Sequence, residues 1–99
     1  MSLGLEKRIG RRIPINCPLQ IKLADGRELL GLVHDLSVEG IRFDCPVQLA
    51  PAQAAEVNLL PPPSSLFPPL HAMIEVIRCD ATDTPLRFMI AAALRVVTP

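Results

Sequence analysis

Two short polar motifs carry most of the chemistry that this sequence can offer. Near its start, Arg8 and Arg12 are separated by three residues, and further along Asp35, Ser37 and Gly40 fall within six residues. Guanidinium groups present planar pairs of donors that fit a phosphate or the O6/N7 edge of guanine. A carboxylate and a hydroxyl offer acceptors for the N–H groups of guanine. The two motifs together indicate a site for an anionic guanine nucleotide.

The arginine pair belongs to a polar segment, residues 1–12, that has little reason to fold alone. Gly10 lies between the two arginines, and Lys7 and Arg11 add positive charge. The spacing lets two long side chains converge on one ligand, or lets one reach a phosphate while the other reaches a base. The alternative is a solvated basic arm that only aids solubility.

The second motif is expected to form a polar corner at a strand end. Asp35 and Ser37 project to the same face if the chain is extended there. Gly40 is expected to adopt a φ that other residues avoid, which turns the chain and leaves both side chains exposed. Arg42 follows closely and could contact a phosphate. Ordinary turn chemistry is the alternative, because Asp and Ser are also common in turns.

Side chains alternate between the two faces of an extended strand, and this argues against a catalytic site at the corner. His34 precedes Asp35 and should therefore point to the opposite face. A triad of Ser37, His34 and Asp35 would need the three side chains to converge. The sequence therefore predicts that this chain is not an enzyme.

In this order, with a strand–turn–strand pattern between them, the motifs resemble the signature of PilZ domains, RxxxR followed by [D/N]xSxxG. The resemblance is good over residues 6 to about 45 and loose over residues 70–97. PilZ domains are bacterial receptors for the second messenger cyclic di-GMP, which is bound as one molecule or as a stacked pair. The resemblance implies a cyclic di-GMP site, with no other cofactor, formed by Arg8, Arg12, Asp35, Ser37 and Gly40 and supported by Lys7, Arg11 and Arg42.

The resemblance also implies an all-β fold, a small six-stranded antiparallel β-barrel that is usually closed by a C-terminal helix. Here the last expected strand is followed directly by Pro99, so the usual helix is expected to be absent. Ala91 stands where the family usually has glycine. One mouth of the barrel would then be uncovered, and a second subunit could fill it as a homodimer.

The residue pattern itself predicts the same fold class. Strands are expected at residues 13–23, 28–36, 41–45, 56–60, 70–79 and 86–97, with a helical turn at 53–56 as an alternative. The first strand alternates strictly, and its inward residues are Ile15, Cys17, Leu19, Ile21 and Leu23. Pro14 and Pro18 place it at an edge or bend it. In the fifth strand Arg78 falls in step with the inward positions.

Glycines mark two further features of the expected sheet. Asp25-Gly26 predicts a hairpin with a type I′ turn. Gly31 predicts a bulge or a close approach of another backbone.

Composition limits the classes of protein that this chain can be. Its 99 residues make one domain, divided into a flexible basic arm at 1–12 and a barrel at 13–99. The net charge is zero and Trp and Tyr are absent, which argues against nucleic-acid binding, although an RNA-binding small barrel stays a third alternative. The three cysteines are far apart, which predicts buried, reduced thiols and no metal site. No signal peptide or membrane-inserting segment is visible, so a cytoplasmic location is expected.

Two functions remain open from the sequence. In the first, residues 5–12 are mobile without ligand, close over cyclic di-GMP and signal to a downstream protein. In the second, the chain is a nucleotide-independent adaptor of pilus or flagellar motility. A proline-rich loop with Leu66 and Phe67 at its centre and the apolar last strand favour this alternative.

Overall fold

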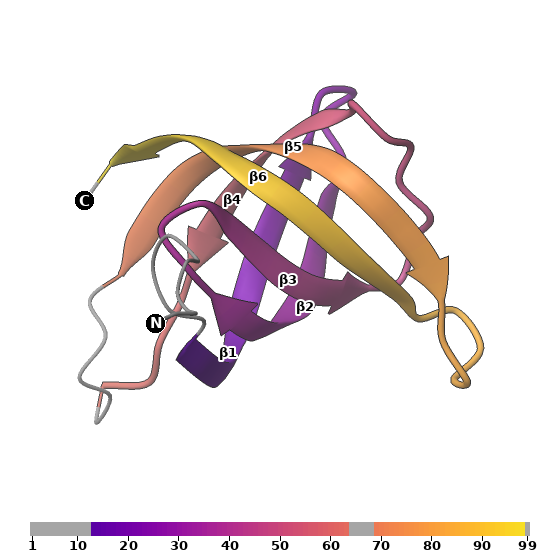
Figure 1. Cartoon of the computed structure of the whole chain (residues 1–99), viewed down its shortest axis with the longest axis horizontal. Helices are drawn as coiled ribbons and strands as arrows, with labels where there is room; N and C mark the ends of the chain where they lie inside the picture. Colours follow the sequence, from indigo (N-terminus) through magenta and orange to yellow (C-terminus); the bar gives the residue numbers. More distant parts are fainter. Residues whose placement is uncertain (1–12, 64–68, 99) are drawn as a thin grey trace, which may run out of the picture.

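The computed structural model describes residues 13–63 and 69–98, and these form a single closed barrel (Figure 1). The described residues contain six strands and no helix. The strands are β1 (Ile13–Leu23), β2 (Glu28–Leu36), β3 (Gly40–Cys45), β4 (Ala54–Leu59), β5 (Leu70–Ala81) and β6 (Phe88–Thr98). This confirms the predicted six-stranded antiparallel barrel. None of the described segments is an apolar helix of membrane-spanning length.

Around the barrel the strands follow the order β1-β2-β3-β6-β5-β4, and every neighbouring pair is antiparallel. Two three-stranded meanders are joined by the β3–β6 and β1–β4 pairs, which leaves no continuous open edge. The β1–β4 ladder begins only at Leu19, so the first half of β1 pairs with β2 alone. Its register also shifts between Pro14 and Cys17. Both proline effects, an edge position and a bend, are therefore present in the same half-strand.

The core fills the inside of the barrel with aliphatic side chains. The alternation predicted for β1 is confirmed, because Ile15, Cys17, Leu19, Ile21 and Leu23 are all buried. Phe43 and Cys45 of β3 have no exposed surface. Burial raises the pKa of the Cys17 and Cys45 thiols, as expected for cysteines that act as small apolar residues.

Two local predictions need correction. Residues 53–56 form no helical turn, because β4 already begins at Ala54. The hairpin after β1 is not a two-residue type I′ turn: Gly26 has φ +94°, but Asp25 keeps a negative φ. The amide of Gly26 instead donates to the carbonyl of Leu23 (2.9 Å), closing a turn one residue earlier. Gly26 then supplies the left-handed residue that follows such a turn in longer hairpin loops.

Gly31 confirms the predicted close approach. A Cβ at this position would overlap the backbone carbonyl oxygen of Asp44 on β3. The adjacent strands therefore pack here at a separation that only glycine permits.

Candidate functional site

The corner between β2 and β3 is held together by Ser37. Its amide donates to the carbonyl of Gly40 at 2.9 Å, which closes the turn. Its Oγ accepts hydrogen bonds from the amides of Gly40 (3.2 Å) and Glu39 (3.3 Å). The Ser37 side chain thus performs the turn chemistry that was the alternative to ligand binding. It shapes the corner on which Asp35 stands.

Gly40 is required for a reason different from the one predicted. Its φ is not in the left-handed region, since Gly26 is the only described glycine with positive φ. A Cβ at Gly40 would instead lie 2.8 Å from the carbonyl oxygen of Ala92 on β6. The glycine lets β3 start in close contact with β6, which fixes the position of the corner on the barrel wall.

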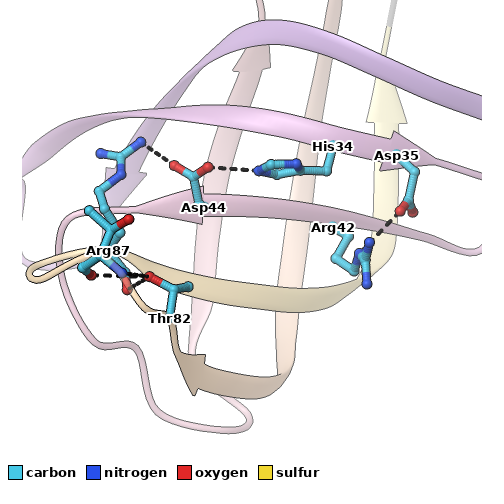
Figure 2. Close-up of polar contacts among 7 residues, drawn as sticks. His34, Asp35, Arg42, Asp44, Thr82 and Arg87 are labelled. Carbon is cyan, nitrogen blue, oxygen red and sulfur yellow. Dashed lines mark hydrogen bonds and ion pairs between the residues drawn. The ribbon is translucent and has the colours of Figure 1, made fainter.

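Asp35 and Arg42 meet on the outer wall of the barrel. The Nε of Arg42 lies 3.1 Å from Oδ2 of Asp35, and the two residues are register partners on β2 and β3 (Figure 2). The Asp35 side chain is only 14% exposed, whereas that of Arg42 is half exposed. The predicted supporting residue Arg42 is therefore brought beside the predicted ligand-binding carboxylate.

The expected opposition of His34 and Asp35 is wrong, because β2 has a register shift between Val33 and Asp35. The extra residue of such a bulge disturbs the alternation of side chains. His34 consequently reaches Asp44 on the outer wall, with 2.7 Å between Nε2 and Oδ2 (Figure 2). The Ser37 Oγ is engaged in its own turn, so these three side chains form no triad.

A hollow of about 370 Å³ borders the Asp35–Arg42 pair. Its other lining residues are Ile77 and Arg78 of β5 and Ala91 of β6. Ala91 is the register partner of both Arg42 and Arg78, so the three residues form one row across β3, β6 and β5. The arrangement places an acid, two guanidinium groups and an apolar side chain around one cavity. It can hold a planar base or an anion.

Arg78 was not recognised as a candidate, because simple alternation placed it inside the barrel. A register shift between Val76 and Arg78 turns it outward instead, where its side chain is 68% exposed. An arginine in step with Ala72, Ile74 and Val76 was the available signal, because a charged group is almost never buried without partners.

The arm that carries the arginine motif joins the barrel beside this hollow. Lys7, Arg8, Arg11 and Arg12 lie outside the described residues. The first described residues pair with the corner, Ile13 with Leu36 and Pro14 with Asp35. Arg12 directly precedes Ile13 in the sequence, so the segment that carries the arginine motif ends where the described chain pairs with the corner.

A second polar cluster on the same wall was not predicted. Asp44 of β3 contacts both His34 and the guanidinium of Arg87, the residue before β6 (Figure 2). Its partners are 10 and 43 positions away in the chain, beyond the range of any local pattern. The cluster ties β2, β3 and the β5–β6 loop together. Among residues 13–63 and 69–98, no three His, Cys, Asp or Glu side chains lie close enough together to hold a metal ion.

The closed barrel of six antiparallel strands places the chain among small all-β domains. The sequence profile of the PilZ domain matches residues 6–96. The chain belongs to the PilZ domain family. No curated protein matches it in sequence.

Two solved structures share the fold. The Bacillus subtilis inhibitor of motility, MotI/DgrA, superposes with a TM-score of 0.77 at 12% identity, covering 95% of this chain and 45% of its own. The PilZ domain of YcgR from Escherichia coli, solved with c-di-GMP, gives a TM-score of 0.64 at 16% identity. That match covers 90% of this chain and 78% of the YcgR chain. The chain thus spans less than half the length of the motility inhibitor.

Proposed function

We propose that this domain is a receptor for cyclic di-GMP, which binds between residues 5–12 and the corner formed by Asp35, Ser37 and Gly40. The pairing of Pro14 with Asp35 carries the proposal, because it starts the arginine-bearing arm at the acidic corner. The hollow beside that corner supplies room for part of the ligand. Membership of the PilZ family supports the choice of ligand.

Each group has a role that its chemistry suits. Arg8 and Arg12 grip phosphate or the O6/N7 edge of guanine. Asp35 accepts hydrogen bonds from the guanine N1–H and N2–H groups, while Ser37 and Gly40 hold the corner in shape. Arg42 orients Asp35 through their ion pair, and Lys7 and Arg11 add positive charge to the arm.

Binding would act by ordering the arm over the ligand. Closure changes the surface around the corner, and a downstream protein reads that change. Micromolar affinity, about 8 kcal/mol, is sufficient for such a receptor. Because the ligand carries two phosphate charges, binding should weaken as salt is added.

Calorimetric titration of the chain with cyclic di-GMP tests the proposal. Replacing Arg8 or Arg12 with Ala should cost about 2–3 kcal/mol of binding free energy through loss of a charge-assisted contact. Lys22→Ala is the control, since Lys22 is exposed and lies at the other end of β1, where its register partners are Glu28 and Glu56. Unchanged affinity in both arginine variants would remove the arm from the site.

The alternative, a nucleotide-independent adaptor, is favoured by a different surface. Met73 and Val96 are register partners on β5 and β6, and both are exposed. An aliphatic patch of this kind suits contact with another protein. Leu66 and Phe67, which were also expected to contribute, lie outside the described residues. Failure of the wild-type chain to bind cyclic di-GMP would favour this alternative.

A further inference from the structure

A row of three residues crosses the hollow beside Asp35. Arg42, Ala91 and Arg78 are aligned across β3, β6 and β5. Neighbouring strands are about 4.8 Å apart, so the two arginine backbones stand about 10 Å from each other. Ala91 between them contributes only a methyl group. The row is therefore a notch with a guanidinium on each side and a small, apolar floor.

The bulge in β5 gives this notch its second wall. Because the register shifts between Val76 and Arg78, two consecutive side chains are exposed, Ile77 at 62% and Arg78 at 68%. Both line the hollow. They also line a second hollow of about 470 Å³ next to the loop at residues 48–51. Arg78 thus stands where the two hollows meet, and its long side chain can swing into the notch.

We propose that Arg78 is a further ligand-binding residue, which grips a phosphate of the cyclic dinucleotide from the side opposite Arg42. The inference rests on the proposed function and adds a residue outside both sequence motifs. A single anion between two backbones 10 Å apart is within reach of two extended arginines, as estimated from strand spacing. Ile77 beside Arg78 covers one face of a guanine ring of the ligand.

Asp80 sets the strength of this contact. Its Oδ2 lies 2.8 Å from the Nε of Arg78, in an exposed pair. The terminal amino groups of Arg78 have no partner among the described residues, so they are the donors offered to the phosphate. The carboxylate partly neutralises the guanidinium, and removing that charge should increase its attraction for an anion.

The test is titration of the full chain with cyclic di-GMP at low and moderate salt. Arg78→Ala should weaken binding about tenfold, less than the loss of Arg8 or Arg12, because Asp80 already partly neutralises the exposed guanidinium of Arg78. Arg78→Lys should recover part of the loss, because an ammonium group still pairs with phosphate. Asp80→Asn should tighten binding about two- to threefold at low salt, and the gain should shrink as salt screens the charge.

Two further variants make the result specific to the notch. In the double variant of Arg78→Ala and Asp80→Asn the gain should vanish, because the carboxylate acts only through Arg78. Ala91→Leu should weaken binding by filling the floor without any change of charge. Arg95→Ala is the matched control: Arg95 is a strand arginine of similar exposure (58% against 68% for Arg78), ion-paired with Glu75 at 3.0 Å, and lines neither hollow. Its affinity should equal that of the wild type.

The outcomes separate this inference from the proposed function. Wild-type affinity in Arg78→Ala, with binding still weakened in the Arg12→Ala variant, would overturn the role of Arg78 alone. No recovery in Arg78→Lys, together with a loss in Arg78→Ala that does not change with salt, would overturn the phosphate contact. A wild-type chain that binds no cyclic di-GMP would overturn both proposals.

Discussion

Asp35 and Asp44 stand on the same outer wall of the barrel and are equally exposed, each side chain at 14%. Asp44 is contacted from two sides, by His34 and by Arg87, and these three residues are called the Asp44 clasp below. Asp44 lines neither of the two hollows described above. Asp35 is paired with Arg42 and borders a hollow next to the point where the cationic arm begins. A carboxylate with an arginine partner is therefore common to both regions.

What differs is the space around the pair and the chain next to it. The Asp44 clasp joins elements that are distant in sequence, so its chemistry serves the fold. At Asp35 the neighbouring wall position is Ala91, whose small side chain leaves room for a ligand. Ion pairing alone does not mark a binding site. The proposed site is supported instead by a half-buried ion pair that borders an open cavity and lies next to the first described residues of β1.

The largest effect expected from this comparison is on ligand affinity. Asp35→Ala should weaken cyclic di-GMP binding by about 2–3 kcal/mol, roughly 30- to 150-fold, because guanine loses a charged acceptor. Asp44→Ala should leave the affinity unchanged. Calorimetry on both variants makes the comparison, and equal losses would show that the two carboxylates do not divide their roles in this way.

Next in size is the response of the two tightly packed glycines. Gly31→Ala should lower the free energy of unfolding by about 2–3 kcal/mol, because its Cβ would overlap the backbone at Asp44. Gly40→Ala should cost less, about 1–2 kcal/mol, since its Cβ would lie 2.8 Å from the Ala92 oxygen.

Urea unfolding followed by circular dichroism measures both glycine variants, as the chain has no Trp or Tyr to report by fluorescence. Gly40→Ala should also weaken cyclic di-GMP binding, because it displaces the corner. Gly31→Ala should not, provided that the titration is made where the variant is folded. The opposite pattern would contradict the assignment of the corner to the ligand.

A smaller effect is expected from neutralising the clasp. Asp44→Asn should lower the free energy of unfolding by about 1–2 kcal/mol, since it leaves the Arg87 guanidinium and the His34 imidazole without their carboxylate partner. Glu75→Gln is the control, because the Glu75–Arg95 pair is well exposed and should contribute almost nothing. If the two variants unfold at the same urea concentration, the clasp does not stabilise the barrel.

The sequence predicts where the strands lie better than it predicts which side of the barrel wall the residues near strand ends face. In β1 the period of two is unbroken from Ile15 to Leu23, and burial follows it. At His34 and Arg78 the period fails, because bulges change the register with the partner strand. A bulge depends on two strands at once, so neither strand's own pattern reveals it.

The same limit applies to the candidate site. Asp35, Ser37 and Gly40 could be found because they are close together in the chain, and Arg42 follows within two residues of Gly40. Arg78 and Ala91 join them only through the order of strands around the barrel. The reason for Gly40 was also hidden, because its close neighbour is Ala92 on β6. Contacts of this kind are consequences of closure and have no local signature.

The smallest effect should come from a third carboxylate–arginine pair, which is exposed and provides a baseline for the other two. Asp25 accepts the amide N–H of Arg27 at 3.0 Å and its Nε–H at 2.9 Å, in the hairpin after β1. The amide hydrogen bond, followed by the Arg27 side chain, lowers the pKa of Asp25. A lowered folded-state pKa contributes stability above the unfolded value of about 3.9, and this is lost as the pH falls through the folded value.

Asp25→Asn keeps an acceptor for the amide and removes only the charge. Its melting temperature should therefore lie slightly below that of the wild type at neutral pH and equal it in acid. A constant difference at every pH would show that the charge of Asp25 does not act on stability, and a loss as large as that of Asp44→Asn would remove burial as the distinction between the pairs.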